Sequence, residues 1–222
     1  GYKLRGVGMN SGNSTRENNF PSGAVDNLLI DSVEHKSPIT TGAWRAPITN
    51  FLAYAEQSFL DEVAQAAGKD PVAFRLELLE KAKAKPVGDL RYDVDRMIGV
   101  IKLAAEKSAW GKKKNVSQGY GGARQQVMGG VVDGLGHAMY SKLSFKDGAA
   151  EQKNYNTYRL IRMKEIPEVE THFVDNGIDP TGLGEPALPP TGGAVANAIF
   201  KATGKRLRSQ PFTDEDVFKS IS

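Results

Sequence analysis

The stretch Gly182-Leu183-Gly184-Glu185-Pro186-Ala187-Leu188-Pro189-Pro190 places one carboxylate in a loop bounded by glycine and proline. The glycines leave no bulk beside Glu185 and the proline after it restricts the backbone, so packing gives no reason for an acid here. The residues that follow, 191–200, begin Thr-Gly-Gly and turn apolar, which predicts a buried helix that starts at 191 and ends near Gly204. An acid beside a helix N-terminus suits an anionic ligand next to a general base.

Composition indicates a globular chain. Its 222 residues are 40% hydrophobic, which is enough for a substantial core, and we predict a single domain over 1–222. With 29 basic and 26 acidic residues, the net charge of +3 does not indicate nucleic acid or an anionic membrane as a partner. The basic cluster at 112–114 is typical of a solvated loop. No apolar run approaches the roughly 20 residues of a membrane-spanning helix.

The chain has no cysteine, which excludes disulfides, thiolate nucleophiles and iron–sulfur or zinc sites held by cysteine within it. Its three histidines, His35, His137 and His172, are widely spaced and form no local metal-binding or Ser-His-Asp pattern. We therefore predict no metal ligands in this chain. The first residues, 1–5, are typical of a strand rather than of a signal peptide, so we expect the chain to be part of a longer protein.

Hydrophobic periodicity predicts a mixed α+β fold. Strands are expected at 4–9 and 28–33, on either side of a polar loop at 10–19, and further strands at 141–145, 155–162 and 168–174. Helices are expected from about 52 to Gly68, from Pro71 to about Ala84, and over 94–107 and 124–143. Glycines at 119–122 mark the best candidate for a break in the organisation.

The helix expected over 124–143 contains four glycines, at 129, 130, 134 and 136. Each costs up to about 1 kcal/mol relative to alanine in a helix interior. Four such positions predict that another backbone or a ligand approaches this helix closely. Tight packing of the helix on a sheet is an equally good interpretation of the pattern.

Four motifs in order carry a resemblance to a known family. They are TGAWRAP at 41–47, EQSFLDEVAQAAGKDPVAFRLELL at 56–79, RQQVMGGVVDGLGHAM at 124–139 and GLGEPALPP at 182–190. Together they resemble the molybdenum-binding subunit of the xanthine dehydrogenase and aldehyde oxidase family, and most of all the branch that contains the isoquinoline 1-oxidoreductase beta subunits. The resemblance extends over about 40–212, and more loosely over the N-terminal strands. It implies the C-terminal molybdopterin-binding domain of these enzymes.

The resemblance implies oxidation of an N-heterocycle or an aldehyde, with water as the oxygen source, at a molybdenum held by molybdopterin. It makes Glu185 the general base and places Arg45 opposite the substrate, where it stabilises developing negative charge. Gln126, Gly129 and Gly130 would then hold the cofactor. Thr191 and Gly192 would hold its anionic group.

The same resemblance implies partners outside the chain, namely a first molybdenum domain and a 2Fe–2S subunit or cytochrome as electron acceptor. It is compatible with a periplasmic location, which the sequence leaves open. Relatives also have strands where this chain passes directly from Gly121 to Ala123, and many have Gln where Asp133 stands. We therefore expect a deletion or junction at 121–123, and a chain that on its own binds no molybdopterin and has no hydroxylase activity.

Two further hypotheses stay open at this point. The chain could be a non-catalytic module that keeps the fold for subunit contact, or a phosphate-binding domain that uses residues 191–193. Convergence of Arg45 and Glu185 on one place would favour the catalytic interpretation over the first of these. An anion at the start of the last helix would favour the second.

Overall fold

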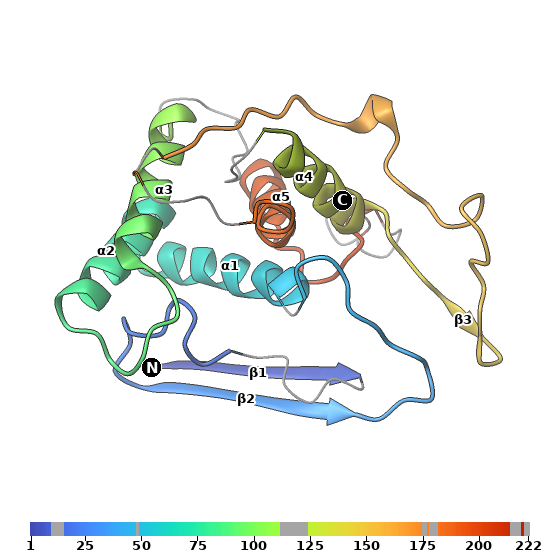
Figure 1. The fold of residues 1–222 in the computed structure, drawn as a ribbon, viewed down its shortest axis with the longest axis horizontal. Coiled ribbons are helices and arrows are strands. Elements are labelled where there is room, and N and C mark those ends of the chain that lie inside the picture. Colours follow the sequence, from blue (N-terminus) through green and yellow to red (C-terminus); the bar gives the residue numbers. More distant parts are fainter. Residues whose placement is uncertain are drawn as a thin grey trace.

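The computed structural model describes residues 1–9, 16–47, 49–111, 124–174, 177, 182–213 and 219. These residues form five α-helices, two small two-stranded sheets and one turn of 3-10 helix, so the predicted mixture of helix and strand is confirmed. In chain order the elements are β1 (Tyr2–Met9), β2 (Leu28–His35), α1 (Thr49–Ala66), α2 (Pro71–Ala84), α3 (Val94–Lys107), α4 (Arg124–Met139), β3 (Phe145–Lys146), β4 (Ala149–Ala150), the 3-10 turn Met163–Glu165 and α5 (Leu188–Thr203). Figure 1 shows α1 lying between the sheet of β1 and β2 and the pair α4 and α5.

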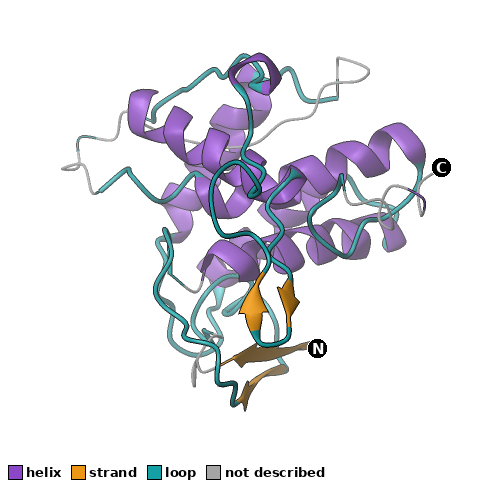
Figure 2. Ribbon diagram, turned by 90° about the vertical axis from the view of Figure 1, so that its right-hand side faces the viewer, coloured by secondary structure: helices purple, strands orange, loops and turns teal. Residues whose placement is uncertain are grey.

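The two predicted N-terminal strands form a parallel pair, in which Tyr2 lies opposite Leu28 and Met9 lies opposite His35. Alternate residues of β1 are covered, and Tyr2 packs edge-on against Phe59 of α1 with ring centroids 6.1 Å apart. Figure 2, which is turned by 90°, shows the strands gathered on one side of the helices. The sheet therefore supports one side of α1, while the described residues leave its other face exposed.

Helices α1, α2 and α3 enclose the first core. Gly68, with a φ of 66°, follows α1, and Asp70 caps α2 by accepting hydrogen bonds from two backbone N–H groups at 2.9 Å. Buried apolar side chains from these helices and from the segment before β2 meet in one cluster. Its members are Phe20, Leu60, Val72, Leu79, Ile98 and Ile101. The three helices therefore lie where the apolar periodicity of the sequence predicts helices.

A second core joins α4 and α5 to the C-terminal segment. It consists of Ala138, Ala196, Leu207 and Phe212, and Tyr54 of α1 packs against it. The Tyr54 hydroxyl also donates to the backbone oxygen of Leu207 at 2.6 Å. Because α1 contributes to both cores, it joins them. A single domain over the whole chain stays a prediction, with which this arrangement is compatible.

Three of the predicted strands are wrong. Of the strand predicted at 141–145, only its last residue is in a strand, the short hairpin Phe145–Lys146 with Ala149–Ala150, and α4 ends at Met139 rather than at 143. The predicted strands 155–162 and 168–174 are not strands. Alternating polarity identifies an extended segment, but a strand also needs a neighbour with which to exchange hydrogen bonds. Within the described residues these segments have none. The predicted break at 119–122 and the start of the polar loop, 10–15, lie outside the described residues.

Candidate active site

The loop that leads into α1 places Arg45 against two distant segments. Its Nε donates to the backbone oxygen of Gly184 at 2.6 Å, and one terminal nitrogen donates to the backbone oxygen of Gln126 at 3.3 Å. The other terminal nitrogen lies 3.4 Å from a carboxylate oxygen of Asp133. Ala46, which is buried with a φ of 56°, turns the chain directly after Arg45. The guanidinium is therefore held by α4 and by the loop before α5.

Glu185 directly follows the residue that Arg45 binds. Its side chain is exposed, and its backbone oxygen accepts a hydrogen bond from the N–H of Leu188 at 3.1 Å, which fixes the turn into α5. Residues 45 and 184 are 139 positions apart, yet they are hydrogen-bonded. The structure therefore brings the Arg45 side chain to the backbone directly before Glu185.

Three further side chains, those of Asp133, His137 and Trp44, form a group with Arg45. The carboxylate of Asp133 lies 3.5 Å from Nε2 of His137, one helical turn later on α4, as well as beside Arg45. The His137 ring in turn packs against Trp44, with centroids 5.0 Å apart and planes at 86°. Sequence reasoning missed this group. The spacing of four residues between Asp133 and His137 was the available signal, since such residues share one face of a helix.

The last helix starts earlier than predicted. It begins at Leu188 rather than at 191, because proline fits the first turn of a helix and residues 189 and 190 are both proline. Proline has no N–H, and the N–H of Leu188 is bonded to Glu185, so this helix start offers few free donors to an anion. This geometry weighs against the phosphate-binding hypothesis.

Thr191 and Gly192 lie in the interior of α5 and are buried. The Thr191 hydroxyl donates to the backbone oxygen of Ala187 at 2.7 Å. A Cβ atom added at Gly192 would lie 2.8 Å from the side-chain nitrogen of Gln210. The structure thus gives both residues a packing role, and their contact with a cofactor stays a prediction.

Close packing against the start of α5 explains two of the four glycines of α4. A Cβ at Gly134 would lie 2.8 Å from the backbone oxygen of Leu188, and one at Gly130 would lie 3.1 Å from the Cβ of Ala187. For these two glycines the close neighbour is the start of α5, which agrees with the predicted approach of another backbone and not with the alternative of packing on a sheet. Gly129 differs, because it is exposed and a Cβ atom added there would meet only a terminal nitrogen of Arg45, at 3.9 Å. Gln126 is exposed as well.

The part of the chain that the structure describes contains neither a cluster of candidate metal ligands nor a membrane-spanning helix. No group of three or more His, Asp or Glu residues there could hold a metal ion. Among the described helices, none is both long and apolar enough to cross a bilayer.

No family model matches the chain. It is similar to several curated proteins, however. It is 27% identical over 232 residues to a membrane-bound aldehyde dehydrogenase of Gluconacetobacter polyoxogenes, named for pyrroloquinoline quinone, with 81% of this chain covered. It is 26% identical over 238 residues to a nicotinate dehydrogenase subunit of Pseudomonas putida, with 84% covered. It is 23% identical over 206 residues to the beta subunit of isoquinoline 1-oxidoreductase of Brevundimonas diminuta, with 71% covered.

The matched region spans only 30%, 20% and 25% of these three relatives. Shorter matches, over 45% of the chain, include xanthine dehydrogenase and aldehyde oxidoreductase molybdenum-binding subunits of Escherichia coli at 29% and 34% identity. Several of these relatives are named as subunits of larger assemblies. The chain thus corresponds to a part of each relative.

Proposed function

We propose that this chain, which is related to the molybdenum-binding subunits of the xanthine dehydrogenase and aldehyde oxidase family, forms one wall of the substrate site of a molybdenum hydroxylase. The reaction inserts an oxygen atom from water into a C–H bond of an N-heterocycle or an aldehyde and releases two electrons and two protons. The electrons pass to a 2Fe–2S subunit or a cytochrome. The hydrogen bond from Arg45 to Gly184 supports this proposal most directly, because it joins the predicted charge-stabilising residue to the loop of the predicted base.

Glu185 is the general base. Its carboxylate is exposed, and two hydrogen bonds hold the backbone around it. Arg45 donates to the carbonyl of Gly184, and the N–H of Leu188 donates to the carbonyl of Glu185. A base fixed in this way can accept a proton at one of its oxygens as oxygen transfer proceeds. Positioned general bases accelerate reactions by roughly 10²–10⁴-fold.

Arg45 stabilises the negative charge that develops on the substrate. A guanidinium carries five N–H groups, and three of them are directed at Gly184, Asp133 and Gln126. Two remain, one on each terminal nitrogen, and can face a bound molecule. Because the three protein contacts already fix the guanidinium plane, little reorganisation is needed during reaction.

The exposed residues of α4 fit part of a cofactor site. Gln126 offers an exposed side-chain amide, and Gly129 leaves open space beside the guanidinium of Arg45, where a planar group could lie against the backbone. When bound, the molybdenum cofactor supplies the redox centre of the reaction. Gly130 faces α5 instead, and Thr191 and Gly192 are buried within α5, so we assign cofactor contact to Gln126 and Gly129.

Substitution of Glu185 with Gln in the complete, cofactor-loaded enzyme tests the proposal. The change keeps the size of the side chain and removes the base, so turnover should fall by at least 10²-fold while molybdenum content stays the same. Glu168→Gln is the matched control, since Glu168 is exposed on the segment after the 3-10 turn. Wild-type kcat in Glu185→Gln would refute the role of Glu185.

We also expect the 222-residue chain on its own to bind no molybdopterin. Two accessible positions on one helix, Gln126 and Gly129, are too few contacts to hold a large anionic cofactor. Metal analysis of the purified chain measures this directly. Stoichiometric molybdenum would show that the chain holds the cofactor unaided.

A role in subunit contact has one observation in its favour. The outer face of the β1–β2 pair carries exposed apolar side chains, at Val7, Met9, Leu29 and Val33, although parallel sheets are usually covered on both faces. Sedimentation velocity of the chain and of Val7→Lys/Val33→Lys tests self-association through this face. If only the wild-type chain dimerises, the contact role gains support independently of catalysis.

A further inference from the structure

We propose that His137 is a positioning residue for Arg45, and that it acts through Asp133. The imidazole of His137 occupies one oxygen of the Asp133 carboxylate, so that only the other oxygen is left to the Arg45 guanidinium. The inference rests on the proposed function, in which Arg45 stabilises negative charge, and it adds a residue of α4 to that function.

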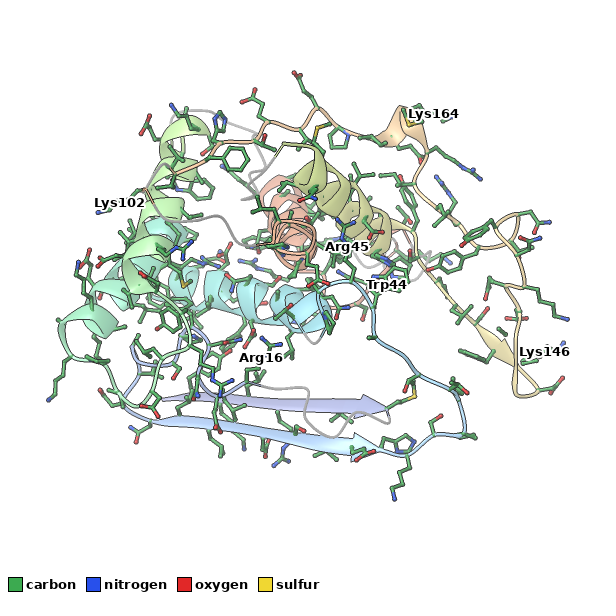
Figure 3. The ribbon with its side chains drawn as sticks, in the orientation of Figure 1. Arg16, Trp44, Arg45, Lys102, Lys146 and Lys164 are labelled. Atoms are coloured by element: carbon green, nitrogen blue, oxygen red, sulfur yellow. The ribbon has the colours of Figure 1, made fainter. Side chains whose placement is uncertain are left out.

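Four side chains form a closed cycle of contacts. A terminal nitrogen of Arg45 lies 3.4 Å from Oδ2 of Asp133, and Oδ1 of the same carboxylate lies 3.5 Å from Nε2 of His137. The His137 ring packs against Trp44, which directly precedes Arg45 in the chain. Figure 3 shows the side chains of Trp44 and Arg45 close together near the start of α1. Each member of the cycle is therefore held from two sides.

The contact between Arg45 and Asp133 is long for an ion pair. Hydrogen bonds between a guanidinium and a carboxylate are usually about 2.7–2.9 Å long, and they often form in pairs, one to each oxygen. Here only one oxygen of Asp133 faces the guanidinium, at 3.4 Å, whereas the bond from Arg45 to the backbone of Gly184 is 2.6 Å long. The second oxygen of Asp133 faces His137, which accounts for the incomplete pairing.

Without His137, both oxygens of Asp133 could turn toward the guanidinium. A two-point pair would draw Arg45 toward α4 and away from Gly184, and it would neutralise more of the positive charge. The side chains of Arg45, Asp133 and His137 are 30%, 35% and 30% exposed, so water screens these charges only in part. His137 therefore preserves both the position and the charge on which the proposed role of Arg45 depends.

The place of His137 on α4 suits this role. Residues 133 and 137 are one helical turn apart, so their side chains lie on the same face of the helix. The perpendicular contact with Trp44 limits rotation of the imidazole. Nε2 carries a proton in this arrangement, because a lone pair directed at the Asp133 carboxylate would be repelled. The imidazole thus presents an N–H group to Asp133.

Substitutions that separate the ring of His137 from its N–H group test the inference in the 222-residue chain. His137→Phe keeps an aromatic ring against Trp44 and removes the N–H group, whereas His137→Gln loses the ring and keeps an N–H donor. The readout is the rate at which the Nε–H group of Arg45 exchanges with water, because the hydrogen bond to Gly184 protects that group. The rate is measured in ¹H–¹⁵N spectra, in which Arg45→Lys assigns the signal.

We expect exchange to be roughly fivefold faster in His137→Phe and within about twofold of the wild-type rate in His137→Gln. A residue that only packs against Trp44 would give the opposite order. That order, or an unchanged rate in His137→Phe, overturns the inference.

His172→Phe is the matched control. Nε2 of His172 lies 3.4 Å from a carboxylate oxygen of Glu170 on an exposed segment, so this pair resembles that of His137 and Asp133. Its loss should leave the exchange rate of Arg45 unchanged. The indole signal of Trp110, whose Nε1 is bonded to Asp70 at 2.7 Å, is the internal reference and should stay in place in every variant.

Asp133→Asn removes the carboxylate through which His137 acts. In that background, His137→Phe should change the exchange rate of Arg45 by less than about twofold. An increase as large as in the wild-type background would show that His137 does not act through Asp133, and it would overturn the inference.

Kinetics of the cofactor-loaded enzyme give the second test. His137→Phe should lower kcat about tenfold and change KM less than about twofold, because the charge that Arg45 stabilises develops only during the reaction. His137→Gln should keep kcat within about twofold of the wild-type value. An unchanged kcat in His137→Phe overturns the inference while leaving the role of Glu185 intact, which Glu185→Gln tests separately.

Discussion

The Nε of Arg45 donates a 2.6 Å hydrogen bond to the backbone oxygen of Gly184, the residue before Glu185. This bond joins the loop that enters α1 to the loop that enters α5, and α1 and α5 also pack against each other. The position of the candidate base therefore depends on a residue that is distant in sequence. The following predictions test this arrangement and the helices that support it.

Arg45→Ala should destabilise the chain by about 1–2 kcal/mol, because it removes hydrogen bonds to Gly184, Gln126 and Asp133 at a partly buried position. Urea unfolding followed by circular dichroism measures this loss. Arg5→Ala is the control, since the Arg5–Asp31 ion pair is exposed and its removal should have a smaller effect. Equal losses in the two variants would mean that Arg45 is not held as described.

Gly134→Ala should destabilise the contact between α4 and α5 by about 1–3 kcal/mol. The added methyl would lie 2.8 Å from the backbone oxygen of Leu188, where the two helices cannot separate without loss of packing. Gly129→Ala is the matched control on the same helix, because its methyl would meet only the end of Arg45 at 3.9 Å. There the higher helix propensity of alanine should stabilise the chain slightly. Thermal unfolding measures the stability of both variants. A Gly129→Ala variant that is less stable than Gly134→Ala would contradict the prediction.

Glu56 should make stability depend on pH. Burial on α1, near Tyr2, raises the pKa of the Glu56 carboxyl from 4.5 to about 7. The folded state therefore binds more protons than the unfolded state between these values, so stability falls as pH rises from about 4.5 and levels off above about 8. The total loss is at most about 3 kcal/mol.

Glu56→Gln isolates this effect. The variant should be more stable than wild type at pH 8 and about equally stable at pH 5, where Glu56 is protonated in the folded state. Urea midpoints at the two pH values provide the measurement. A stability difference between variant and wild type that does not change with pH would exclude Glu56 as the source.

Asp70→Ala should destabilise the chain by about 1–2 kcal/mol. It removes the cap of α2, which accepts from the N–H groups of Val72 and Ala73, and also the acceptor for the Trp110 indole. Asp70→Asn keeps a side-chain oxygen that can cap the helix, and it should retain most of the stability. Hydrogen exchange of the first turn of α2 distinguishes a local loss from a global one. If Asn is as damaging as Ala, the cap is not the cause.

Local signals along the chain are enough to predict several of the helices and strands. The bounds of α2 and α3 follow from apolar spacing and from caps such as Asp70, and β1 and β2 follow from short apolar runs beside polar loops. Arg45 and Glu185 were identified as candidates from two short motifs. In each case the information lies within a few residues along the chain.

How these elements meet became visible in the three-dimensional structure alone. It showed that Gly130 and Gly134 of α4 accommodate the start of α5, and that Asp133, His137 and Trp44 form a group with Arg45. It also removed the strands predicted at 155–162 and 168–174, which lack neighbours among the described residues. These outcomes depend on contacts between segments that are far apart in sequence or on a partner strand. Hydrophobic periodicity within one segment predicts which face of that segment is buried, but it does not predict which other segment covers that face.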